Sequence, residues 1–94
     1  MGKKSTPSIE QQLTQKQEEL AQAQVTQSNA YSEYIKVMRA KSIVDPSETE
    51  KLEKLNELMF EHFTDYQHAL EQSQKLQLEL SVLEAQKYLE ELLP

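Results

Sequence analysis

The sequence contains no cysteine and no tryptophan, and it has only one glycine and three prolines among 94 residues. Without cysteine, the chain can form neither a disulfide nor a thiolate zinc site. With a single glycine, Gly2, it cannot build a glycine-rich phosphate loop. No apolar run approaches the ~20 residues of a membrane span, and the polar first residues lack the core of a secretory signal. We therefore expect a cytoplasmic protein without a cofactor.

The residues that are abundant are strong helix formers. Gln, Glu, Leu, Lys and Ala dominate the composition, in which 37% of residues are hydrophobic and 28% are charged. Such residues with apolar positions at heptad-like spacing are typical of long helices and coiled coils. The sequence therefore predicts an all-α fold.

Two helix starts are marked by capping signals. The first follows a polar tail at residues 1–6, where Thr6 and Pro7 suit the N-cap and first helical position; Ser8 with Gln11 is a second possible capping box. The second is Asp45-Pro46, where Asp45 would cap, Pro46 would begin the helix and Glu48 would close the box. We expect one domain over residues 7–94, with helices at about 7–42 and 46–92 joined by a turn at 43–46.

The second predicted helix carries a continuous apolar seam. Because its members recur at steps of three or four, and the connection is short, the pattern predicts an antiparallel two-helix hairpin with coiled-coil-like packing. The predicted seam is Leu52, Leu55, Met59, Phe63, Tyr66, Leu70, Leu76, Leu80 and Leu83. Residues 75–83 also alternate apolar and polar like a strand, and both alternatives remain open, although helix propensity favours a helix.

A second apolar set lies on the opposite side of the same helix, because two residues advance about 200° around a helix axis. It consists of Leu78, Val82, Ala85, Leu89 and Leu92. A hairpin partner covers only one side, so we expect this second side to bind another protein or another copy of the chain. The hairpin would then be completed by oligomerisation or by a partner helix.

Charge and side-chain chemistry narrow the function further. Residues 46–94 carry eleven acidic groups against four lysines, which argues against nucleic-acid binding. The only histidines are His62 and His68, which are six residues apart, so we expect no metal site. We expect no enzymatic activity and no small-molecule substrate. The leading hypothesis is an assembly adaptor or small helical chaperone. The alternatives are a self-assembling coiled-coil subunit and an acidic inhibitor that mimics nucleic acid.

One short pattern concerns the membrane. Met1-Gly2 followed by Lys3, Lys4 and Thr6 matches the loose N-myristoylation motif. The motif is short and occurs often by chance, so we do not expect membrane attachment. Whether Gly2 is lipidated stays open at this point.

Overall fold

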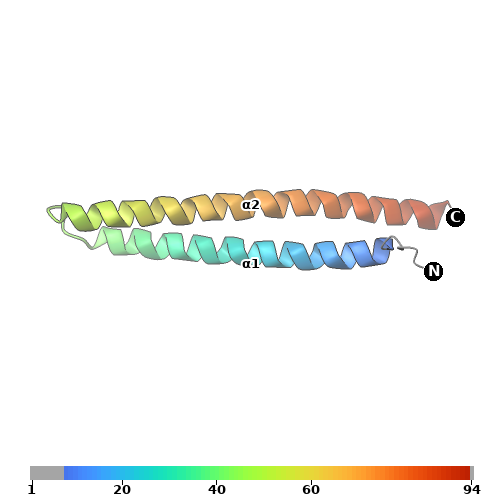
Figure 1. The fold of residues 1–94 in the computed structure, drawn as a ribbon, viewed down its shortest axis with the longest axis horizontal. Coiled ribbons are helices and arrows are strands. Elements are labelled where there is room, and N and C mark those ends of the chain that lie inside the picture. Colours follow the sequence, from blue (N-terminus) through green and yellow to red (C-terminus); the bar gives the residue numbers. More distant parts are fainter. Residues whose placement is uncertain (1–7, 94) are drawn as a thin grey trace, which may run out of the picture.

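The protein is an antiparallel hairpin of two long helices, seen in a computed structural model that describes residues 8–93. Helix α1 spans Ile9–Ser42 and helix α2 spans Thr49–Leu92, and the two pack against each other along their length (Figure 1). The molecule measures 70 × 32 × 13 Å. The predicted all-α hairpin is confirmed, and the molecule is a rod.

The start of α1 is set by the second of the two predicted caps. The Ser8 hydroxyl accepts a hydrogen bond from the Gln11 backbone N–H at 3.1 Å, and the Ser8 N–H donates to Gln11 Oε1 at 3.1 Å. This reciprocal pair satisfies two amides that have no partner within the helix. The helix therefore begins at Ile9, two residues later than expected. Thr6, Pro7 and the Gly2 lipidation motif lie outside the described residues.

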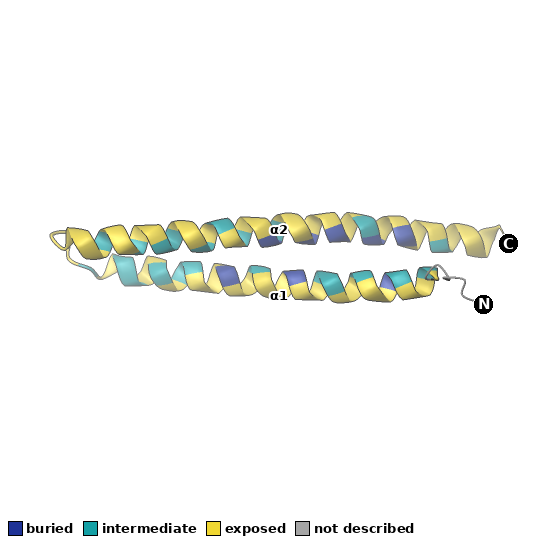
Figure 2. Ribbon diagram, in the orientation of Figure 1, coloured by how far each residue is buried: buried dark blue, intermediate teal, exposed yellow. Residues whose placement is uncertain are grey.

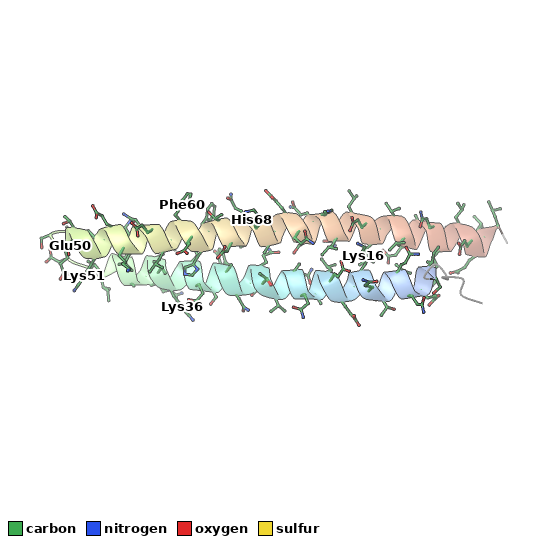
Figure 3. The ribbon with its side chains drawn as sticks, viewed as in Figure 1. Lys16, Lys36, Glu50, Lys51, Phe60 and His68 are labelled. Atoms are coloured by element: carbon green, nitrogen blue, oxygen red, sulfur yellow. The ribbon has the colours of Figure 1, made fainter. Side chains whose placement is uncertain are left out.

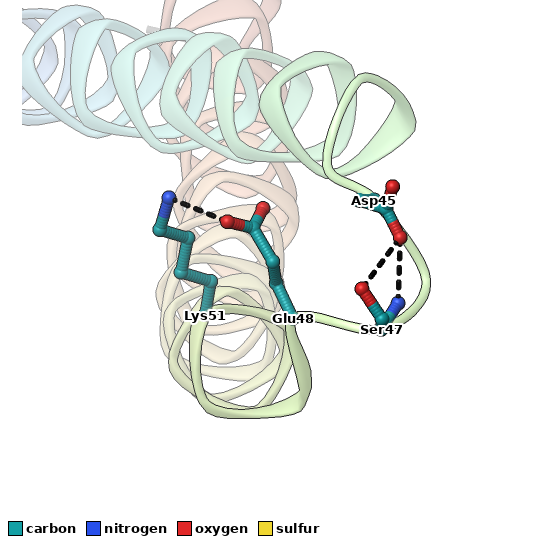
Figure 4. A network of polar contacts seen from close by, with 4 residues as sticks. All are labelled: Asp45, Ser47, Glu48 and Lys51. Atoms are coloured by element: carbon teal, nitrogen blue, oxygen red, sulfur yellow. Dashed lines mark hydrogen bonds and ion pairs between the residues drawn. The ribbon is translucent and has the colours of Figure 1, made fainter.

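The turn differs from the prediction at Asp45 and Pro46. Instead of capping α2, Asp45 Oδ1 accepts hydrogen bonds from the Ser47 N–H at 2.9 Å and the Ser47 hydroxyl at 2.8 Å (Figure 4). An aspartate readily reaches the amide two residues ahead, and Pro46 fits the following turn position. The Glu48 N–H then donates to the Asp45 carbonyl, which closes the turn.

This turn shifts the start of α2. The predicted first residue was Pro46, but the helix begins at Thr49, and its N-cap residue Glu48 makes no side-chain capping bond. Glu48 instead pairs with Lys51, with 3.0 Å between Oε1 and Nζ (Figure 4). The connection thus covers residues 43–48 rather than 43–46.

The packing between the helices changes in character along the rod (Figure 2). At the end that holds the termini, Leu13 packs with Leu80 and Leu83 in a buried leucine cluster. We call the next section the waist; it is lined by small or polar residues, which are Ala23, Gln27, Ala30, Ala69 and Ser73. The section next to the turn is only half-buried. Apolar burial is therefore concentrated at the end opposite the turn.

Two predicted seam residues, Phe63 and Leu70, flank the interface rather than form its centre. The longest regular run of buried and half-buried positions on α2 alternates steps of three and four residues, and this run passes through His62 and Ala69. Phe63 remains 41% exposed. The reason is geometric: a coiled-coil seam keeps its 3.5-residue period even where the larger apolar side chain is one position away.

The strand-like stretch at residues 75–83 is continuous helix within α2, so the helical alternative is confirmed. Between residues 8 and 93, neither helix is long and apolar enough to cross a membrane.

Candidate partner-binding face

The residues predicted to bind a partner form one exposed stripe on α2. We call this stripe the outer face; it comprises Leu78, Val82, Ala85, Leu89 and Leu92. Leu78 is 69% exposed and Val82 is 52% exposed. Their steps of four, three, four and three residues are those of a coiled-coil seam. The structure thus brings all five residues together and leaves them without a partner within residues 8–93.

On the side opposite the outer face, α2 packs against α1. Leu76, which is 2% exposed, Leu80 and Leu83 point to the opposite side of α2 and pack toward α1. Because these leucines alternate with Leu78 and Val82, the same helical turns are buried on one side and open on the other. Because these turns of α2 are packed against α1, the part of the outer face that carries Leu78 and Val82 is a preformed helical surface.

The positions beside the outer face are nearly free of charge. On one edge lie Gln74, Ser81 and Tyr88, and on the other lie Glu79 and Gln86. Charged residues at such flanking positions normally select the partner and the orientation of a coiled coil. Here a partner helix would meet amide, hydroxyl and aromatic groups, with Glu79 as the one carboxylate.

That carboxylate is already engaged within the hairpin. Lys16 Nζ lies 2.8 Å from Glu79 Oε1, and Figure 3 shows Lys16 between the two helices. The hydrogen bond from Lys16 lowers the pKa of Glu79 below its usual range, and the same bond raises the pKa of Lys16. The pair therefore stays ionised at neutral pH, and each charge largely cancels the other.

A second ion pair fixes how the helices align at the end that holds the termini. Glu10 Oε1 lies 3.0 Å from Lys87 Nζ, and the hydrogen bond to Glu10 raises the pKa of Lys87. Since Glu10 is in the first turn of α1, the residues of α2 beyond Lys87 reach the end of α1 and extend past it (Figure 1). The last residues of α2 therefore lie on a part of the helix that α1 hardly covers.

An aromatic cluster joins the two helices between the waist and the turn. The rings of Tyr31 and Tyr66 lie 5.4 Å apart, and those of Tyr34 and Phe63 lie 5.5 Å apart. Such tilted pairs between the helices add stability beyond the area they bury. Since each pair joins α1 to α2, we interpret the cluster as structural.

The described residues include no candidate metal site. No group of three or more His, Asp or Glu side chains in residues 8–93 is arranged to hold a metal ion. His62 lies half-buried along the seam, whereas His68 is exposed on the side of α2 away from α1 (Figure 3). The two histidines therefore do not converge.

Several exposed apolar residues were not predicted as binding residues. Tyr88 and Leu93 extend the outer face at its edge, whereas Phe60, Val25 and Ile43 stand apart from it. The sequence does signal Tyr88 and Leu93, because both lie at flanking positions of the outer-face heptad. Ile43 is exposed because it follows the last residue of α1, and no periodicity marks it.

No family model matches the chain, and no curated protein or solved structure matches it.

Proposed function

We propose that the protein is a non-enzymatic helix-binding module, an assembly adaptor or small helical chaperone that docks a partner helix on its outer face. The observation that carries this proposal is the exposure of Leu78, Val82 and Leu89 at coiled-coil spacing, directly behind a buried leucine cluster. A helix apolar on two sides is normally buried on both. One side of α2 is covered by α1, and the other is available.

The chemistry of the face indicates what kind of helix would bind. Apolar side chains at heptad spacing accept the corresponding side chains of an amphipathic helix, and the uncharged flanks impose little charge selection. Binding should therefore respond weakly to salt. The acidic-inhibitor alternative makes the opposite prediction, because a contact between acidic α2 residues and a basic site weakens strongly as salt rises.

The test uses a labelled synthetic helix with leucine at its heptad core positions and uncharged flanking residues. We expect it to bind the full chain, and we expect Val82→Asp with Leu89→Asp to weaken binding by at least about 30-fold, because each aspartate is desolvated in the interface. Val25→Asp is the matched control, since Val25 is also exposed, at 57%, but lies on the outside of α1.

The control and the salt series decide the outcome. Val25→Asp should leave binding unchanged, and binding should vary little between low and high salt. Equal binding by the double variant and the wild type would overturn the proposal, as would no binding by any form. Circular dichroism of each variant checks that the hairpin remains helical.

A further inference from the structure

We propose that, when no partner helix is bound, the outer face is covered by the outer face of a second copy of this chain, packed antiparallel. The inference rests on the proposed function of the outer face and identifies what covers that face in the absence of a partner helix. This arrangement would regulate binding, because a partner helix would have to displace the second copy. Self-association would keep the outer face covered until a partner helix binds.

The outer face is complementary to itself in reverse. If two copies of α2 cross with the two-fold axis midway between Val82 and Ala85, Leu78 of one copy lies opposite Leu89 of the other. Val82 then lies opposite Ala85, so that a branched side chain meets a small one at the centre. Leu92 falls opposite the aliphatic stem of Lys75, which can cover it while its ammonium group stays in water. All five outer-face residues thereby gain partners.

Charge favours the antiparallel arrangement over a parallel one. The stretch from the cap of α2 to residue 65 carries six acidic residues against only two lysines: Glu48, Glu50, Glu53, Glu57, Glu61 and Asp65. A parallel dimer would place two copies of this acidic stretch side by side, which costs free energy through like-charge repulsion. The antiparallel dimer overlaps only the last part of α2 and sends the acidic stretches in opposite directions.

The overlap region itself opposes self-association very little. Of the outer face's flanking residues, Gln74, Ser81, Gln86 and Tyr88 are uncharged, and Glu79 is paired with Lys16. Antiparallel helices also align their dipoles favourably. A protein with a net charge of −6 therefore still has one surface on which a second copy meets almost no repulsion.

The rod as a whole exposes more surface than a compact protein of its mass. The chain exposes 7517 Å². A compact monomer of its mass would expose only about 5,600 Å². The excess is more than twice the ~800 Å² that each partner contributes to a standard protein interface. An interface of standard size on the outer face would remove about 800 Å² per chain, which is less than half of that excess.

Sedimentation equilibrium of the full chain from about 1 to 500 μM provides the test. We expect a monomer–dimer equilibrium with a dissociation constant of roughly 1–100 μM, since the four large exposed side chains of each outer face offset the cost of association only moderately. Val82→Asp should weaken the dimer by at least about 30-fold, and Val25→Asp should leave it unchanged. A monomer at all concentrations, or a dimer insensitive to Val82→Asp, would overturn the inference.

Cysteine cross-linking tests the orientation, and the absence of natural cysteine makes single variants unambiguous. A mixture of Val82→Cys and Ala85→Cys should form a mixed disulfide, whereas each variant alone should cross-link at least about 10-fold less, because its two sulfurs are offset along the axis. Strong cross-linking of each variant alone would indicate a parallel pair and would overturn the arrangement.

The two proposals fail in different ways. If the synthetic helix binds but the chain stays monomeric, the helix-binding function stands and the self-association inference is wrong. If the chain dimerises through Val82 but does not bind the synthetic helix, the outer face is a homotypic contact, and the helix-binding function is wrong. Loss of both would leave the outer face without a role.

Discussion

Leu76 and Leu78 allow a direct comparison of the two sides of α2. They are two residues apart in the same helix, yet Leu76 is 2% exposed and Leu78 is 69% exposed. Leu76→Ala removes a fully packed side chain and leaves a gap between the helices, which costs about 3 kcal/mol in the free energy of unfolding. A domain of this size has a total of roughly 5–14 kcal/mol. The substitution should therefore be severe without necessarily unfolding the chain.

Leu78→Ala should change the same free energy by less than about 0.5 kcal/mol, because its side chain faces solvent and alanine is a good helix former. The assay is urea unfolding followed by circular dichroism. For a slope of about 2 kcal/mol/M, Leu76→Ala should lower the midpoint by roughly 1.5 M.

Protein concentration separates monomer stability from association. The urea titration of each variant is carried out at two protein concentrations, one below the expected dimer dissociation constant and one well above it. The comparison is informative because dimerisation adds to apparent stability by mass action. At low concentration, equal losses for Leu76→Ala and Leu78→Ala would refute the assignment of the two sides. At high concentration, an added loss specific to Leu78→Ala would support self-association through the outer face.

Three further predictions follow from polar contacts. Ser8→Ala removes the N-cap of α1 and should lower the free energy of unfolding by about 1 kcal/mol in urea titrations, whereas Ser8→Asp should largely retain it. In a double-mutant cycle, Ser73→Ala and Gln27→Ala should couple by about 0.5–1.5 kcal/mol, because their side chains share a hydrogen bond of 3.1 Å in the waist; zero coupling would contradict this role. Because Lys16 lowers the pKa of Glu79 below its usual 4.5, the stabilisation from this ion pair is present above about that pH and is lost as the pH falls further. Wild type and Glu79→Gln should therefore differ in stability at pH 7 and converge in acid, and a pH-independent difference would be inconsistent with the ion pair.

Much of the architecture follows from the sequence because the relevant signals are long and regular. A seam that repeats over more than thirty residues, with one proline-marked break, leaves the hairpin as the consistent solution. The exposed stripe that includes Leu78 and Val82 was predictable for the same reason. Helical spacing assigns residues to opposite sides independently of the details of packing.

The parts that could not be predicted depend on competition between similar local options. Asp45 could bond either the turn amide of Ser47 or the first amides of α2, and both are typical for aspartate before proline. The seam could pass through Phe63 or His62, which are adjacent, and hydrophobicity alone favours Phe63. The phase of the whole heptad, set by burial at many other positions, selected His62 instead.

The distribution of core residues also bears on how the chain folds and opens. The leucine cluster joins Leu13 to Leu80 and Leu83, so the strongest contacts are among those most distant in sequence. Helix pairing that spreads from the turn gains little stability until those distant leucines meet, because the small residues of the waist bury little apolar area. We therefore expect a late, cooperative transition state and slower folding than in hairpins whose core lies beside the turn. In the folded rod, the half-buried section next to the turn should unfold locally more often than the leucine cluster, so its backbone amides should exchange with solvent faster.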